Sequence, residues 1–307
     1  TVELLQSQDA QGESLVFVIN GIKVFAKGAN WIPADAFLPR VKAEDYDRYV
    51  RLAKEANMNM LRVWGGGIYE DPAFYEACDK AGIMVWQDFM YACALYPDHL
   101  ESFQREAQKE AELVVSMLRK HPCIVLWCGN NENNWGFHSW WNKGDPEYLG
   151  NYLYKQLLPE VVTRLAPDCP YRPSSPWGGE DPNGQDIGDR HSWDVWSNWL
   201  NYEFYALDKG RFISEFGFQA LPAYKTVLSY TRPEDRKLFS PVTQSHNKME
   251  QGTERLVRYL AGYLGLPRDY QSFVHLTQLN QALALKLGVE AWRGRKFDTA
   301  GALIWQL

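Results

Sequence analysis

Two carboxylates, Glu132 and Glu215, each follow a short apolar run. The run from Cys123 to Cys128 is rich in apolar and β-branched residues, as is typical of a buried parallel strand, and a similar run after Arg211 leads into Glu215. Two strand-end carboxylates that face one cavity are able to hydrolyse a glycosidic bond, because one protonates the leaving oxygen while the other attacks the sugar or activates water. A single strand-end glutamate would indicate no more than a solvated loop, so the interpretation depends on the pair.

The segments that must position these carboxylates alternate between strand-like and helix-like patterns. Apolar spacing predicts helices at about 43–56, 72–81, 100–120, 149–166, 253–263 and 274–293. Short apolar runs predict strands at about 23–28, 58–64, 83–88, 123–128 and 171–175, followed by strands that end near 191–193, at 215 and at 306. Eight strands alternating with helices predict a (β/α)8 TIM barrel rather than an open doubly wound sheet, and chemistry in such barrels collects at the C-terminal strand ends.

Three departures from regular alternation are expected. Residues 15–28 predict an N-terminal β-hairpin that turns at Asn20-Gly21 and whose second arm is the first barrel strand. The Gly-, Pro- and Asp-rich stretch 176–190 predicts an irregular barrel around the fifth and sixth strands. Pro159 should kink or break the helix at 149–166. We expect residues 1–307 to form a single catalytic barrel domain, excised from a larger multidomain enzyme.

Six motifs together carry a family resemblance that extends from about residue 25 to the end of the chain. They are G-A-N-W-I-P (28–33), L-R-V-W-G-G-G-I-Y-E (61–70), V-W-Q-D-F (85–89), W-C-G-N-N-E-N (127–133), S-E-F-G-F-Q (214–219) and A-L-I-W-Q-L (302–307). In this order they resemble the catalytic barrel of glycoside hydrolase family 2, most closely its β-mannosidases. The resemblance implies a retaining exo-glycosidase that removes terminal β-D-mannose, with Glu132 as general acid/base and Glu215 as nucleophile.

The resemblance also implies a set of substrate-binding residues. Arg62 lies inside an apolar strand and would supply the cation that keeps Glu215 ionised. Asn131 would hydrogen-bond the sugar 2-hydroxyl, which is axial in mannose. His191 would reach a hydroxyl or steady a carboxylate, although Ser192 stands where related sequences often carry an aromatic residue. The walls of the first subsite would be the tryptophans at predicted strand ends, Trp64, Trp193 and Trp305.

Three further residues have alternative interpretations. Trp135 and Trp140 follow the acid/base in sequence and could border the next sugar subsite or only fill the core. Asp88 could be a third catalytic carboxylate, but two suffice, so we expect a structural role for it.

The proposed chemistry sets two physical requirements. Glu132 should have a raised pKa so that it carries a proton at working pH, whereas Glu215 should stay ionised. A retaining enzyme also needs its carboxyl groups about 5–5.5 Å apart, against ~6.5–9.5 Å for an inverting one.

Composition limits the remaining function classes. The net charge of −6 without a Lys/Arg block argues against nucleic acid as a partner, and no apolar run has the length of a membrane span. Six histidines show no H-x-H or H-E-x-x-H spacing, so we expect no metal and no cofactor. Five cysteines, an odd number, indicate free thiols.

The expected partners are a small oligosaccharide or glycan substrate and flanking β-sandwich domains of the parent chain. The open alternatives are another family 2 specificity (β-galactosidase, β-glucuronidase, exo-β-glucosaminidase or endo-β-mannosidase) and a non-catalytic carbohydrate-binding barrel. The compartment stays open between periplasmic or secreted, cytoplasmic and lysosomal.

Overall fold

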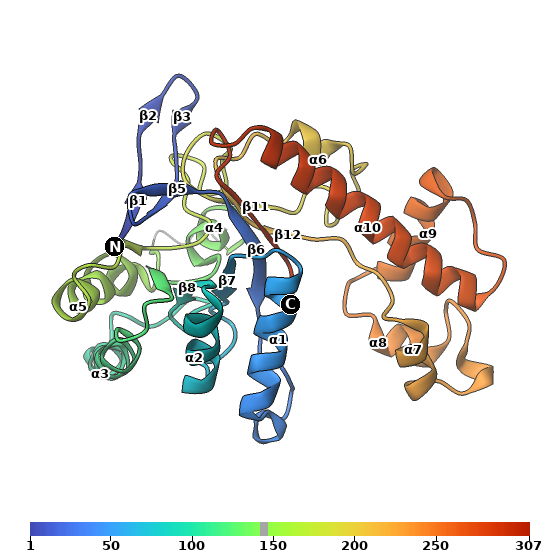
Figure 1. Ribbon diagram of the computed structural model, residues 1–307, viewed down its shortest axis with the longest axis horizontal. Helices are drawn as coiled ribbons and strands as arrows, with labels where there is room; N and C mark the ends of the chain where they lie inside the picture. The colour runs from blue at the N-terminus through green and yellow to red at the C-terminus, as the bar shows by residue number, and fades with distance from the viewer. Residues whose placement is uncertain (142–146) are drawn as a thin grey trace. The chain divides into compact units, whose positions relative to one another are not determined.

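The protein is described by a computed structural model that covers residues 1–141 and 147–307. Its main feature is an eight-stranded sheet in the order β10-β9-β8-β7-β6-β13-β12-β11 (Figure 1). The strands are β6 (Ala26–Trp31), β7 (Met60–Val63), β8 (Met84–Asp88), β9 (Ile124–Cys128), β10 (Tyr171–Arg172), β11 (Arg190–Ser192), β12 (Ile213–Phe216) and β13 (Gly301–Ile304). The last strand, β13, pairs in parallel with the first, β6, as closure of a barrel requires. The predicted (β/α)8 barrel is confirmed.

The irregularity predicted around the fifth and sixth strands is also confirmed. β10 and β11 are two and three residues long and form the two ends of the sheet order. A single bridge from Asn131 to Ser175 continues the pairing of β9 with β10, and another joins Trp177 to Asp189 between β10 and β11. The Asp189 side chain adds to this link by accepting hydrogen bonds from Ser175 Oγ at 2.7 Å and the Trp177 amide at 3.1 Å.

The helices of the barrel lie outside its strands. They are α1 (Ala43–Glu55), α2 (Pro72–Ala81), α3 (Glu101–Leu118) and α5 (Leu158–Leu165), which stand beside one another around β6 to β9 in Figure 1. Asp71 caps α2 by accepting a hydrogen bond from the Ala73 amide, and Gly82 ends it with φ +70°. Residues 151–165 are helical throughout, so Pro159 does not break the helix. A π-helical turn, Leu153–Leu157, instead precedes α5, and Pro159 lies in the first turn of α5, where its missing amide hydrogen is tolerated.

The N-terminal hairpin differs from the prediction in one respect. β4 (Val16–Ile19) and β5 (Ile22–Val24) pair across Asn20 and Gly21, which both have positive φ. The second arm ends at Val24, however, and the first barrel strand begins separately at Ala26. β1 (Val2–Leu5) adds a third strand to this small sheet, and β2 (Gln8–Asp9) pairs with β3 (Gly12–Glu13).

Alternation along the strands separates two apolar cores. Leu61 and Val63 of β7 point outward to the helices, whereas Met60 of the same strand points into the barrel. Trp86 and Phe17 join Met60 in the inner cluster, so the hairpin fills the lower end of the barrel. This inner cluster forms the apolar floor of the barrel, and the inward-facing polar side chains lie beyond it, toward the C-terminal ends of the strands.

Residues 192–208 and 217–294 form a second compact unit. Its helices are α6 (Phe204–Leu207), α7 (Tyr224–Tyr230), α8 (Pro241–His246), α9 (Gly252–Tyr263) and α10 (Tyr270–Gly294). The two predicted helices correspond to α9 and α10, although α10 begins four residues before its predicted start. The grouping of residues 1–307 into one domain stays a prediction.

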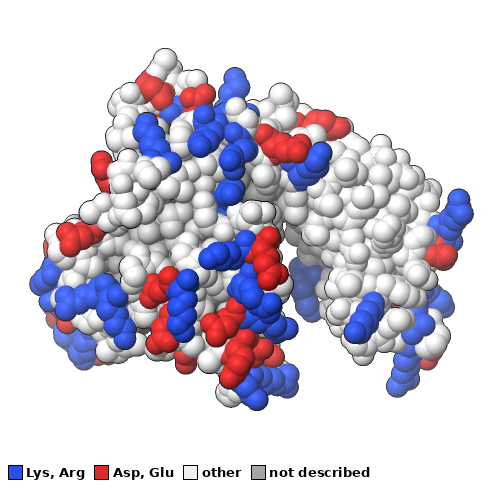
Figure 2. All heavy atoms as spheres, viewed as in Figure 1, with Lys and Arg blue, Asp and Glu red and all other residues white. Residues whose placement is uncertain are grey.

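Charge is mixed over the outside of the barrel. Figure 2 shows Lys/Arg and Asp/Glu side chains interspersed around α1 and α2, and Arg48–Asp45 and Arg51–Glu55 form ion pairs there at 3.2 and 3.7 Å. Within residues 1–141 and 147–307, no helix is both long and apolar enough to cross a membrane. The absence of nucleic-acid and membrane partners stays a prediction.

Candidate active site

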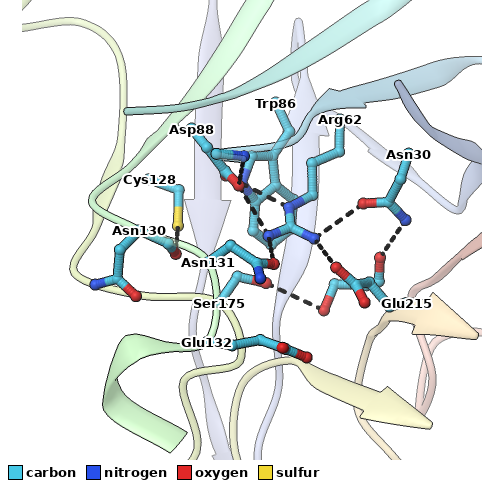
Figure 3. Close-up of polar contacts among 12 residues, drawn as sticks. Asn30, Arg62, Trp86, Asp88, Cys128, Asn130, Asn131, Glu132, Ser175 and Glu215 are labelled. Atoms are coloured by element: carbon cyan, nitrogen blue, oxygen red, sulfur yellow. Dashed lines mark hydrogen bonds and ion pairs between the residues drawn. The ribbon is translucent and has the colours of Figure 1, made fainter. Parts of the chain in front are cut away.

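A buried arginine organises the C-terminal end of the barrel. Arg62 follows Met60 on the inward face of β7, and its side chain has no exposure to solvent. Its guanidinium donates from Nη1 to Glu215 Oε1 at 2.7 Å and to Asn30 Oδ1 at 2.9 Å (Figure 3). Nη2 donates at 2.8 Å both to Asp88 Oδ2 and to Asn131 Oδ1. The four partners come from different strands or strand ends, so one cation fixes them all.

Glu215 lies within β12, whose pairing with β13 shifts register between Ile213 and Phe216, whereas Glu132 lies beyond the end of β9. Glu132 has a left-handed backbone, φ +63°, immediately before the short helix α4 (Asn133–Gly136). Its amide donates to the Ser175 carbonyl at 2.7 Å. A non-glycine residue in this conformation is strained, and such strain concentrates at functional sites.

His191 connects the two carboxylates. Its Nδ1 lies 2.7 Å from Glu132 Oε1 and 3.4 Å from Glu215 Oε2. Its Nε2 lies 3.1 Å from Ser175 Oγ, which donates to Asp189 Oδ2 at 2.7 Å. The imidazole is thereby fixed at both nitrogens.

The carboxylates are close together. One oxygen each from Glu132 and Glu215, with a ring nitrogen of His191, form a group whose atoms all lie within 4.8 Å of one another. This limit on the distance between one oxygen of each carboxylate is compatible with a retaining pair, and the retaining geometry stays a prediction.

Comparison with known proteins identifies the family, although no family model matches the chain. β-Mannosidase B of Emericella nidulans is 39% identical over 324 residues, a match that covers all of this chain and 38% of that protein. The Aspergillus flavus β-mannosidase B is 40% identical with the same coverage. The crystal structure of the β-D-mannosidase from Dictyoglomus thermophilum is 54% identical and superposes with a TM-score of 0.97 over 99% of this chain and 38% of that one. The chain belongs to glycoside hydrolase family 2, as a β-mannosidase-like domain.

This family 2 domain also shares its fold with more distant enzymes. The exo-chitosanase of Amycolatopsis orientalis superposes with a TM-score of 0.73 at 15% identity, which shows a common fold alone. The chain spans about 38% of the length of the β-mannosidases that it matches.

The surroundings of the family 2 carboxylates shift their pKa values against our expectation. Burial acts to raise the pKa of Glu132, but the hydrogen bond and charge of His191 outweigh it, with smaller contributions from Cys93 and Arg62, so the pKa is lowered. Burial raises the pKa of Glu215 despite the charges of His191 and Arg62, and the negative charge of Glu132 adds to the rise. The expectation of a raised pKa for Glu132 is wrong because the effect of His191, in contact at 2.7 Å, exceeds that of burial.

The predicted aromatic walls are only partly placed. Trp64 and Trp305, at the ends of β7 and β13, meet edge to face with ring centroids 5.0 Å apart. Trp193 belongs to the second unit, so its role at the sugar stays a prediction. Trp135 lies 4.7 Å from Trp140 and 6.3 Å from His191, centroid to centroid, which puts both indoles at the edge of this site.

Several residues of the site were absent from the predicted set. Asn30 donates to the Ser214 carbonyl while accepting from Arg62, and Ser175 and Asp189 support His191. Asn30 stands in the G-A-N-W motif, two residues after Gly28, and this inward alternation was the signal available. Asp88, expected to be structural, is fully buried and holds Arg62.

Glu132, His191 and Glu215 are also the one group of possible metal ligands found among the described residues. Arg62 already supplies a positive charge to Glu215 at 2.7 Å, so the group has a cation of its own. We assign no metal to it, and metal-free chemistry stays a prediction.

Proposed function

We propose that this domain is the catalytic barrel of a retaining exo-β-mannosidase, which releases terminal β-D-mannose from the non-reducing end of β-mannosides. The observation that carries the proposal is the Glu132–Glu215 pair. One oxygen of each carboxylate lies within 4.8 Å of the other, and among the ion pairs described only Glu215 is paired with Arg62. The β-mannosidase names of the relatives support the sugar specificity. The other family 2 specificities and the binding barrel have no comparable support.

The reaction proceeds by double displacement. Glu215 attacks the anomeric carbon as the glycosidic bond breaks, and Glu132 gives its proton to the leaving oxygen. Glu132 then removes a proton from water, which attacks the glycosyl ester and releases mannose with its configuration retained. His191 Nδ1, 2.7 Å from Glu132 Oε1, holds the carboxyl in place for both proton transfers.

We propose that Asn131 recognises the axial 2-hydroxyl of mannose through a hydrogen bond. Its Oδ1 accepts a hydrogen bond from Arg62, which fixes the orientation of the amide. Its Nδ2 is therefore the atom that would donate to the sugar. This orientation supports specificity for mannose, because an equatorial hydroxyl would lie elsewhere on the ring.

The proposed partners are a small oligosaccharide or glycan, and β-sandwich domains that flank the barrel in the native protein. The relatives are more than twice the length of this chain, which leaves room for such domains in them. Limited proteolysis of the native protein should release a stable fragment close to residues 1–307 if the barrel folds independently.

The test is hydrolysis of a panel of p-nitrophenyl β-glycosides by the native protein that contains this chain, beside Glu215→Gln. Turnover of the mannoside that disappears in the variant supports both the specificity and the nucleophile. Turnover of a different glycoside keeps the mechanism and refutes the specificity. Activity that survives in the variant refutes the nucleophile, and no turnover of any sugar favours the binding barrel.

A further inference from the structure

A cysteine thiol contacts the proposed general acid/base. Cys93 is exposed and lies on the connection between β8 and α3. Its Sγ is 3.4 Å from Glu132 Oε2, within the range of a hydrogen bond to sulfur. The double displacement derived above gives this residue no role.

The loop that presents the thiol is tied to the end of β9. The Cys93 amide donates to the Asn131 carbonyl at 3.1 Å, and the Asn131 amide donates to the Tyr91 carbonyl at 2.9 Å. The Ala94 amide donates to Asn133 Oδ1 at 3.1 Å. Cys93 itself has φ +47°, so two non-glycine residues with left-handed backbones, Cys93 and Glu132, meet at this point.

The direction of the thiol hydrogen follows from its neighbours. Asn131 Nδ2 donates to Cys93 Sγ at 3.5 Å and so occupies a sulfur lone pair. The S–H is then directed to Glu132 Oε2, while His191 holds Oε1. We propose that Cys93 is a positioning residue for the general acid/base, whose S–H fixes the Glu132 carboxyl opposite His191. This inference rests on the proposed function.

A thiol suits this position because it is a weak hydrogen-bond donor. Although the residue as a whole is exposed, the protein around its sulfur desolvates the thiol; this desolvation, followed by the negative charge of Glu132, raises the pKa of Cys93 to about 12, so the sulfur keeps its hydrogen at neutral pH. A stronger donor such as a serine hydroxyl would stabilise the ionised carboxylate more and would weaken Glu132 as an acid. Cys93 therefore orients the carboxyl and lowers its pKa less than a hydroxyl would.

The experiment compares Cys93→Ala, Cys93→Ser and the control Cys169→Ala in the native protein. Cys169 also carries a free thiol, but it lies two residues before β10 at the opposite end of the barrel and donates to the Ile124 carbonyl. Equal thermal midpoints for the three variants establish that they fold alike. The substrates are β-1,4-mannobiose, whose leaving group needs a proton, and 2,4-dinitrophenyl β-mannoside, whose leaving group does not.

We expect Cys93→Ala to lower kcat/KM about tenfold on mannobiose and less than about threefold on the dinitrophenyl mannoside. A residue that only supports the fold would lower both equally. Cys169→Ala should change neither. Equal losses on both substrates, or no loss on mannobiose, would overturn the inference. Wild-type protein that hydrolyses neither substrate would refute the proposed function instead.

The pH profile gives a second readout. The groups that face Glu132 are His191, Glu215, Arg62 and Cys93, and the hydrogen bond from Cys93 lowers the Glu132 pKa. Because the acid must be protonated, Cys93→Ala should move the basic limb of kcat/KM to higher pH, and Cys93→Ser should move it to lower pH. A limb at the same pH in both variants would contradict the positioning role.

Discussion

The ends of β9 and β12 carry the two carboxylates on very different supports. Glu215 lies within strand β12 and is bound to Arg62, whereas Glu132 lies beyond β9, has a left-handed backbone, and contacts His191 and Cys93. Arg62 holds Glu215 in place, but burial and the negative charge of Glu132 raise the Glu215 pKa against the charge of Arg62. His191 and Cys93 each contact one oxygen of Glu132, and His191 outweighs burial and lowers the Glu132 pKa. Different neighbours therefore fix the two carboxylates, and the pKa values of the two shift in opposite directions.

The largest effect should come from replacing the nucleophile. Glu215→Ala should lower kcat on the order of 10⁴-fold or more, because no covalent intermediate forms. Azide should restore turnover and give α-mannosyl azide, since a single displacement inverts the anomeric centre. The product's configuration is read by NMR. A β-mannosyl azide product would instead indicate that Glu132 is the nucleophile and Glu215 the acid/base.

Replacing the acid/base should cost less and depend on the leaving group. Glu132→Ala should lower kcat/KM roughly 10²- to 10⁴-fold on mannobiose and much less on the dinitrophenyl mannoside. Azide should here give β-mannosyl azide, by attack on the intact glycosyl-enzyme. Equal losses on both substrates would show that Glu132 is not the proton donor.

The arginine should matter for stability as well as for activity. Arg62→Met removes the cation from two buried carboxylates, Asp88 and Glu215, and should lower the free energy of unfolding by about 3–5 kcal/mol. Arg48→Met, at an exposed ion pair on α1, is the control and should cost at most about 1 kcal/mol. Denaturant unfolding measures both, and equal losses would show that the buried network is not special.

The smallest effect concerns the pH dependence of stability. Replacing Glu215 and replacing Glu132 should change this dependence in opposite directions. Because the pKa of Glu215 is raised in the folded state, the wild type loses stability as the pH rises from the ordinary carboxyl pKa through the folded value. The stability of Glu215→Gln relative to wild type should therefore increase from about pH 4 upward. The lowered pKa of Glu132 stabilises the wild type above the ordinary carboxyl pKa, and this is lost as pH falls through the folded value. Glu132→Gln should therefore lose relative to wild type as pH rises. The measurement is the thermal midpoint of each variant relative to wild type from about pH 3 to about pH 8. If both differences changed with pH in the same direction, the opposite pKa shifts of Glu132 and Glu215 would be refuted.

Sequence patterns predicted the elements that local chemistry determines. The hairpin at Asn20-Gly21 and the capped helix α2 both depend on residues close together in the chain. The short helices α6, α7 and α8 have too few turns for an apolar period to emerge. The first barrel strand was placed too early because the apolar run continues through the boundary between β5 and β6.

The site was predictable only where a motif marks a strand end. Glu132 and Glu215 follow apolar runs, and Arg62 interrupts one. The contacts of Ser175 and Cys93 depend on pairs 16 and 39 residues apart, and no local spacing reveals them. The direction of the Glu132 pKa shift was wrong because a sequence does not give the distance between Glu132 and His191, which decides whether burial or His191 prevails.

The apolar floor of the barrel has a consequence for the electric field at the site. Phe17 of the hairpin packs on Trp86, and Trp86 lies beneath the Arg62 guanidinium and donates from its indole to Asp88 at 2.9 Å. Rings rather than mobile dipoles therefore occupy the space below the arginine. In the proposed reaction, little around Arg62 has to reorient as charge develops on the sugar. The reorganisation energy around Arg62 is therefore small, because folding has already fixed the groups that surround it.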